Sequence, residues 1–149
     1  MRKGFTLIEL LVVIGILAVL LTITLIAINP ARQFSQSNNT KRRSDILTIL
    51  NAIGQYAADH KGALPNGITV GTATAGAEIS SSATDLCTYL ISDYVSALPV
   101  DPLTNNGAPV ATCSGSYDTG YRVVRSSFNN RITVDAPNAE LNEVITVTR

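Results

Sequence analysis

Residues 5–28 read FTLIELLVVIGILAVLLTITLIAI, and this stretch decides how the chain is organised. As an α-helix it would extend roughly 36 Å at about 1.5 Å per residue, enough to cross a hydrocarbon layer about 30 Å thick with some tilt. No charged residue occurs between Leu10 and Ala31. In lipid the backbone must form its hydrogen bonds internally, so a helix is expected despite the many Val, Ile and Thr residues.

A single carboxylate, Glu9, interrupts the apolar segment. A secretory signal peptide would be shorter and would end in small residues at a cleavage site, which residues 26–30 match poorly. A plain membrane anchor fits the length. It does not explain an acid that costs about 2.5–3.5 kcal/mol on insertion scales and usually has a partner. The segment therefore predicts a membrane-spanning helix in which Glu9 has a further role.

The start of the chain resembles the class III signal of type IV prepilins and pseudopilins over residues 3–18, KGFTLIELLVVIGILA. The short basic leader, the Gly-Phe pair and the Glu five positions into the apolar run carry the resemblance. In that family a membrane prepilin peptidase cuts after the Gly and methylates the new terminal amine. The resemblance therefore implies cleavage between Gly4 and Phe5, N-methylation of Phe5, and Glu9 as the fifth residue of the mature chain.

The residues around the implied cleavage site have properties that suit these roles. Gly4 has no side chain, so a protease can approach the backbone closely. Arg2 and Lys3 would hold the leader on the cytoplasmic side. Cleavage removes these two of the 11 basic side chains and leaves all 11 acidic ones, so the mature chain has more acidic than basic side chains. Cleavage also creates a terminal amine. We expect this amine to pair with Glu9 of a neighbouring subunit. Basic residues also follow the apolar run, so the orientation rests on the resemblance.

Asn29 and Pro30 predict a kink or local break, because proline removes a helical hydrogen bond and clashes with the preceding turn. The polar residues 32–45 fit either a solvated helix or a linker. Apolar residues then recur at spacings of three and four from Ile46 to Ala57, and Gly62 follows as a stop signal. One long helix is expected from about residue 5 to residue 61. The expected organisation is a leader at 1–4, a transmembrane and filament-core helix at 5–30, its amphipathic second half at 31–62, and a globular head at 63–149.

The head reads as a short helix followed by strands. Residues 85–95 predict the helix, with Asp85 as its N-cap, and the proline-containing residues 98–103 predict an extended, turning path. Strands are expected at 121–127, 131–136 and 143–148, with a hairpin turn at 128–130 and a short strand at 68–70. The fold class is α+β. The resemblance implies a type IV pilin-like fold, whose long helix packs on an antiparallel sheet of three to four strands.

Cys87 and Cys113 are the only cysteines. Outside the cytoplasm they could form a disulfide, which the chain-entropy model values at about 3–4 kcal/mol for a loop of this length. Two buried free thiols are the other interpretation. Nothing nearby suggests an activated thiolate, so a redox-active pair is not expected.

The remaining polar residues point to no catalytic or metal site. The basic run Lys41 to Arg43 is expected to form a solvated helix face or to contact acids of a neighbouring subunit. A DNA contact there finds little support in the near-neutral charge. Asp101, Asp118 and Asp135 are too dispersed for the six to eight oxygen ligands of calcium, so no metal is expected. His60 is interpreted as a cation at a helix C-terminus. With one His, no phosphate-binding loop and no nucleophile motif, we expect neither an enzyme nor a cofactor.

The resemblance implies a structural subunit that polymerises with copies of itself into a helical filament. The implied partners are a prepilin peptidase, an assembly ATPase and a platform protein in the inner membrane. The precursor would be a single-pass protein of the cytoplasmic membrane with its head outside, and the filament would be extracellular or periplasmic. A pilus subunit is preferred. A type II secretion pseudopilin, favoured by the proline-rich turn at 98–102, and a membrane-anchored module that binds DNA or another ligand remain alternatives.

Overall fold

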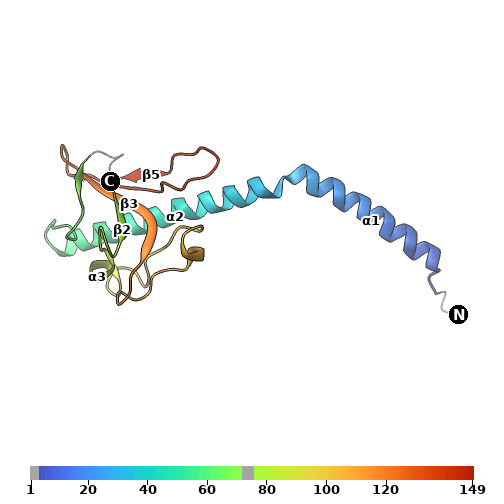
Figure 1. Ribbon diagram of the computed structural model, residues 1–149, viewed down its shortest axis with the longest axis horizontal. Helices are drawn as coiled ribbons and strands as arrows, with labels where there is room; N and C mark the ends of the chain where they lie inside the picture. The colour runs from blue at the N-terminus through green and yellow to red at the C-terminus, as the bar shows by residue number, and fades with distance from the viewer. Residues whose placement is uncertain (1–3, 72–75) are drawn as a thin grey trace. The chain divides into compact units, whose positions relative to one another are not determined.

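The computed structural model describes residues 4–71 and 76–149, which form two compact units that divide between Ser35 and Gln36. A long N-terminal helical region and a small mixed sheet make an α+β chain consistent with a pilin-like fold (Figure 1). The helices are α1 (Leu7–Ile28), α2 (Pro30–Asp59), α3 (Cys87–Leu90) and a 3-10 turn η1 (Asn105–Gly107). The strands are β1 (Val70–Gly71), β2 (Ala77–Ser80), β3 (Asp118–Ser126), β4 (Ile132–Asp135) and β5 (Thr146–Thr148).

The single long helix expected from the sequence is two helices, separated at Asn29. Asn29 lies in the left-handed region, with φ 47° and ψ 78°, a conformation that asparagine tolerates better than most residues. Pro30 begins α2 at the first helical position, where its missing N–H needs no partner. The backbone N–H of Arg32 donates to the Asn29 carbonyl at 3.1 Å. Pro30 therefore marks the start of a helix, and the non-helical conformation of Asn29 separates this helix from α1.

The second half of α2 forms one wall of the core of the head. Ile46, Ile49 and Ile53 are at most 1% exposed, and they pack against the inner face of the sheet, where Tyr121 and Val123 of β3 are fully buried. The spacing of three and four along α2 places these side chains on one face of the helix. The amphipathic pattern is therefore confirmed by burial.

The sheet has five strands and is mixed, which corrects the expected antiparallel meander of three to four strands. The order is β1-β3-β4-β5, and β2 also pairs with β3. β1 runs parallel to β3, whereas the β3–β4 hairpin and β5 are antiparallel. The strand β2 was not predicted, because its sequence AEIS lies in a stretch rich in Gly, Ala, Ser and Thr with no clear alternation. This strand is stabilised by its pairing with β3 and by the burial of Ile79.

The helix predicted for residues 85–95 is shorter than expected. Only Cys87–Leu90 is helical, and Ser92, with φ 80°, turns the chain into a bridge between Ile91 and Val95. Asp85 is not the N-cap, a position held by Leu86, but its carboxylate accepts the backbone N–H of Cys87 at 2.9 Å. The acid therefore still satisfies an amide at the start of the helix.

Candidate processing and assembly site

Thr6 and Glu9 form a reciprocal capping box at the start of α1. The backbone N–H and the hydroxyl of Thr6 donate to Glu9 Oε2 at 2.8 and 2.7 Å, and the Glu9 N–H donates to Thr6 Oγ1 at 3.3 Å. The two side chains thus satisfy two amide groups at the start of the helix that would otherwise lack partners, the carboxylate accepting one and the Thr6 hydroxyl the other. Its other oxygen, Oε1, accepts no hydrogen bond within residues 4–71 and 76–149, so it is available to a further donor. The T-x-x-E spacing is the sequence signal for this arrangement.

The Gly4–Phe5 bond lies just before α1, in a segment that makes little contact with the rest of the fold. Phe5 is 90% exposed, and a methyl group added at Gly4 would meet no atom within 4 Å. The fold therefore does not require a glycine at this position. Arg2 and Lys3, the expected leader charges, lie outside the described residues.

None of the 22 residues of α1 is buried within the chain. The helix is apolar around its whole circumference, and among the described residues it alone is long and apolar enough to cross a membrane. A helix that is apolar on every side needs lipid or other helices around it. A Cβ at Gly15 would meet open space, so another helix could approach the backbone closely there. The surface of α1 is therefore suited both to a bilayer and to a helical bundle.

The basic run Lys41 to Arg43 corrects an expectation in part: Lys41 and Arg43 are exposed, but Arg42 is not part of a solvated face. Arg42 is fully buried and donates to Asp101 at 2.6 and 3.2 Å and to Glu140 at 2.8 Å. Burial lowers the pKa of the guanidinium, but the hydrogen bonds to Asp101 and Glu140 more than offset this, and the net pKa is raised. Arg43 pairs with Glu143. Arg42 and Arg43 therefore tie α2 to the head within one chain.

A second polar cluster also connects α2 to the head. Lys41 Nζ donates to Asp45 at 2.8 Å and to the Val100 carbonyl at 2.7 Å, while the Tyr121 hydroxyl donates to Asp45 at 2.7 Å. Burial, reinforced by the hydrogen bond to the Asp45 carboxylate, raises the pKa of Tyr121, so its hydroxyl remains a donor. Together with the Arg42–Asp101 pair, this cluster holds the proline-containing turn against α2. Sequence reasoning missed both clusters, since their partners are more than 50 positions apart.

The three acids considered for calcium lie apart, each with its own local partner. Asp101 is buried on Arg42, Asp118 accepts the N–H of Gly120 at 2.8 Å, and Asp135 pairs with Arg122 at 2.7 Å. No group of three or more His, Cys, Asp or Glu side chains suited to a metal occurs among the described residues. His60 stacks on the ring of Tyr56 with 3.9 Å between ring centroids, and its Nδ1 lies 2.9 Å from the Tyr56 carbonyl. The histidine is thus part of the end of α2.

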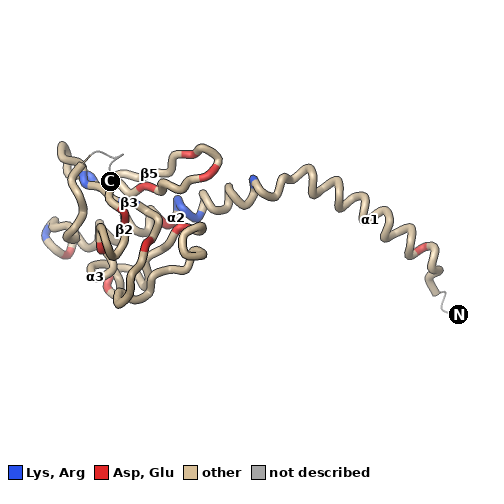
Figure 2. The backbone as a smooth tube through the Cα atoms, in the orientation of Figure 1, with Lys and Arg blue, Asp and Glu red and all other residues tan. Residues whose placement is uncertain are grey.

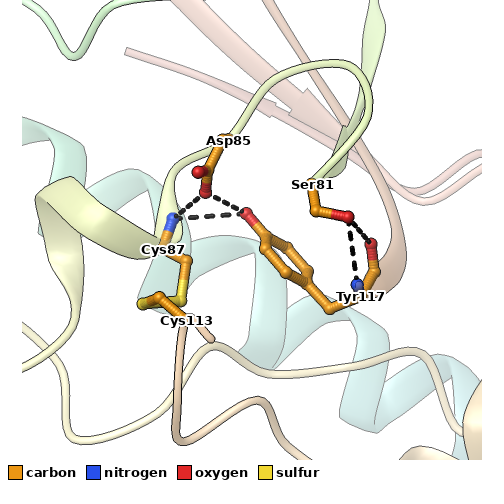
Figure 3. Close-up of a disulfide and its surroundings, with 5 residues drawn as sticks. All are labelled: Ser81, Asp85, Cys87, Cys113 and Tyr117. Carbon is orange, nitrogen blue, oxygen red and sulfur yellow. Dashed lines mark hydrogen bonds between the residues drawn. A yellow bond between two sulfur atoms is a disulfide. The ribbon is translucent and has the colours of Figure 1, made fainter. Parts of the chain in front are cut away.

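Cys87 and Cys113 form a disulfide that joins α3 to the segment before β3 (Figure 3). Cys87 is fully buried, and Tyr117 packs beside the bridge with its hydroxyl donating to Asp85 at 2.7 Å. Burial and that hydrogen bond raise the pKa of Tyr117, so the phenol stays protonated. Ser81 adds hydrogen bonds to the backbone of Tyr117. The bridge therefore anchors a segment that has little regular structure of its own.

Replacing both cysteines, as Cys87→Ala with Cys113→Ser, is expected to lower the free energy of unfolding of the head by about 3–4 kcal/mol. The cause is the loop of 26 residues that the unfolded chain regains. Chemical denaturation in detergent, with and without a reductant, measures the difference. The reductant should destabilise the wild-type chain and leave the double variant unchanged. Equal stability of the two proteins under oxidising conditions would contradict the expectation.

Comparison with known proteins bears on the N-terminal segment alone. Residues 1–25 match the family model described as the prokaryotic N-terminal methylation motif, which is the class III signal of type IV pilins and pseudopilins. No curated protein and no solved structure gives a significant match. The motif thus coincides with the Gly4–Phe5 bond, the Thr6–Glu9 capping box and most of α1.

Proposed function

We propose that this chain is the precursor of a type IV pilin-like structural subunit. A prepilin peptidase cleaves it between Gly4 and Phe5 and methylates the amine of Phe5. The mature subunit then leaves the inner membrane and polymerises into a helical filament through α1. The proposed division is a leader at 1–4, a transmembrane and filament-core helix at 5–30, an amphipathic half at 31–62 and a head at 63–149.

The observation that carries the proposal is the combination of an unburied and predominantly apolar α1 with one carboxylate in its first turn. Lipid covers the apolar surface in the precursor, and a bundle of neighbouring α1 helices would cover it again in the filament. Glu9 is costly in either environment without a cationic partner. The amine created at Phe5 in a neighbouring subunit supplies that partner, and Glu9 Oε1 can accept a hydrogen bond from it.

The filament would be open and helical, because the proposed contact joins unlike surfaces of identical subunits and does not close on itself. The charge pair sets the axial register of adjacent helices, while small residues such as Gly15 and Ala18 permit close packing. The methylation motif is typical of structural subunits, and we assign no enzymatic role or cofactor. An assembly ATPase and a platform protein are the proposed machinery, and the filament would lie outside the cytoplasm.

The test of processing is mass spectrometry of the N-terminus of the protein recovered from native membranes. We expect a terminus at Phe5 that carries one added methyl group. A Gly4→Val variant should keep the full leader, because a branched side chain blocks the approach of a protease to the backbone. The open space around Gly4 means that this variant should fold like the wild type. A wild-type terminus at Met1 or Arg2 would overturn the proposal and leave a simple membrane anchor.

A pseudopilin of a type II secretion system is the second candidate, favoured by the proline-containing turn that Arg42 and Lys41 hold against α2. The two candidates differ in where the filament ends. Recovery of the processed chain in fibres sheared from the cell surface favours a pilus. Its confinement to the periplasm, together with loss of protein secretion on deletion, favours a pseudopilus.

A further inference from the structure

Two exposed side chains at the turn of the β3–β4 hairpin, Phe128 and Arg131, are here called the hairpin knob. Phe128 is 96% exposed, more than any other large apolar side chain among the described residues. The backbone N–H groups of Phe128 and Arg131 donate to Ser126 Oγ and Asn129 Oδ1 at 3.3 and 3.2 Å, so bonds within the turn hold both residues. The guanidinium of Arg131 makes no hydrogen bond or ion pair within residues 4–71 and 76–149. Aromatic residues and arginine are enriched at the centres of protein interfaces.

A hollow of about 420 Å³, here called the acidic hollow, lies beside the start of β3. Its lining comes from β2, from η1 and from the segment that leads into β3, and it includes Glu78, Ser80, Ser82, Asn105, Tyr117 and Asp118. Among the described residues, no lysine, arginine or histidine lines it. Arg122, the cross-strand neighbour of Glu78, is bound instead to Asp135 at 2.7 Å. Asp118 uses one oxygen to accept the N–H of Gly120 at 2.8 Å. The carboxylate of Glu78 and the second oxygen of Asp118 therefore have no partner in the part of the chain that the structure describes.

Tyr117 gives the acidic hollow an aromatic wall that is fixed in place. Its hydroxyl donates to Asp85 at 2.7 Å, and its backbone is hydrogen-bonded to Ser81 (Figure 3). Benzene fits in a cavity of about 150 Å³, so the acidic hollow has room for a phenyl ring together with a guanidinium. Aromatic rings attract one another in edge-to-face and offset arrangements. The acidic hollow therefore matches the hairpin knob in size, in charge and in aromatic character.

The hairpin knob and the acidic hollow lie at opposite ends of one strand. Asp118 is the first residue of β3 and Ser126 is the last, so the strand between them extends roughly 26 Å at about 3.3 Å per residue. One chain therefore cannot place its own knob in its own hollow. Figure 2 shows basic positions of the head beside the C-terminus and acidic positions around β2 and α3. Surfaces that are complementary but far apart on one head can meet only between two copies.

We propose that the hairpin knob of one subunit enters the acidic hollow of the next subunit. Arg131 donates to the carboxylates of Glu78 and Asp118, while the ring of Phe128 packs against Tyr117. The two surfaces are unlike, so the contact is head-to-tail and repeats without closing on itself.

This contact rests on the filament proposed above. One knob in one hollow is a small interface, whereas stable specific interfaces bury about 1,200–2,000 Å². A bundle of α1 helices holds the heads at high local concentration, and under that condition a weak contact is occupied. Its role is then to fix the orientation of each head relative to the next one.

The direct test places the photoreactive amino acid benzoylphenylalanine at position 128 of the full-length chain and irradiates sheared fibres. We expect a covalent dimer, in which mass spectrometry locates the crosslink within residues 78–82 or 104–118 of the second copy. The same amino acid at position 144 is the matched control. Val144 is 87% exposed but belongs to neither surface, so a crosslink from there should not mark those residues.

Charge reversal tests the ion pair within the contact. Arg131→Glu is expected to lower the yield of the dimer crosslinked from position 128 by about 3- to 10-fold, because like charges then face each other. Glu78→Arg alone should have the same effect, and the two reversals together should restore most of the yield. Lys61→Glu changes the net charge as Arg131→Glu does, from an exposed residue that lines neither surface, and should keep the wild-type yield. Circular dichroism should be unchanged, since Glu78 and Arg131 are exposed.

The outcomes separate this contact from assembly through α1. Fibres that form normally but give no dimer, or a dimer crosslinked at other residues, would overturn the head-to-tail contact and leave the proposed function intact. The contact is also overturned if the double reversal restores nothing while each single variant keeps its fold. Absence of fibres from the wild-type chain would instead overturn the proposed filament, and the contact between heads with it.

Discussion

Glu9→Gln is expected to reduce filament yield by at least about 50-fold while leaving cleavage after Gly4 intact. In the proposed filament, the amine of Phe5 from one subunit meets Glu9 of its neighbour. Loss of the negative charge leaves the amine unpaired in an apolar bundle, at a cost of about 2.5–3.5 kcal/mol for each contact. Sheared fibres quantified by immunoblot, with mass spectrometry of the membrane-bound pool, measure assembly and cleavage separately.

The choice of glutamine separates charge pairing from helix capping. Glutamine retains an oxygen that can accept the Thr6 N–H, so the capping box survives the change. Thr6→Val does the reverse, since it removes the hydroxyl that contacts Glu9 and keeps the carboxylate. We expect Thr6→Val to assemble much better than Glu9→Gln. Wild-type yield from Glu9→Gln would show that the acid acts only as a local cap and would remove the charge pair from the mechanism.

The N-terminal helix and the amphipathic part of α2 could be predicted because their signals are local. A continuous apolar run has one stable backbone state in lipid, and Ile46, Ile49 and Ile53 repeat with the helical period. The break at Asn29 was only partly predictable. A proline predicts that a helix is kinked or interrupted nearby, but the same residue is favourable at the first position of a helix. In the structure Pro30 occupies that first position in α2.

The head was harder to predict because its connections are made by residues far apart in sequence. Nothing in the spacing of Lys41 to Arg43 distinguishes a solvated basic face from one whose central guanidinium is buried on Asp101 and Glu140. The strand β2 likewise exists through its pairing with β3. The candidate site at the N-terminus shows the opposite behaviour. Gly4, Phe5 and Glu9 form a compact motif, so sequence alone could predict them as a candidate site.

Loss of the buried ion pair between Arg42 and Asp101 is the second change expected to have a large effect, here on the stability of the head. Asp101→Asn is expected to lower the free energy of unfolding of the head by about 3–5 kcal/mol, because it leaves Arg42 buried with only part of its compensating charge. Thermal unfolding followed by circular dichroism in detergent should show a midpoint lower by roughly 10 °C or more. Asparagine keeps the shape of the side chain, so the effect reports the charge and its hydrogen bonds.

Arg43→Gln is the matched control, one residue away on the same helix. Its partner Glu143 is about a third exposed and Arg43 about half exposed, so loss of this pair should cost no more than about 1 kcal/mol. An apolar replacement of both partners, Arg42→Met with Asp101→Leu, should recover part of the loss, since it removes the buried charge along with its counter-ion. Recovery should be incomplete, because Glu140 and Asn39 would each lose one of their donors. If Asp101→Asn proved as mild as Arg43→Gln, water would have to reach Arg42, and the pair would not be what fastens the turn at residues 98–103 to α2.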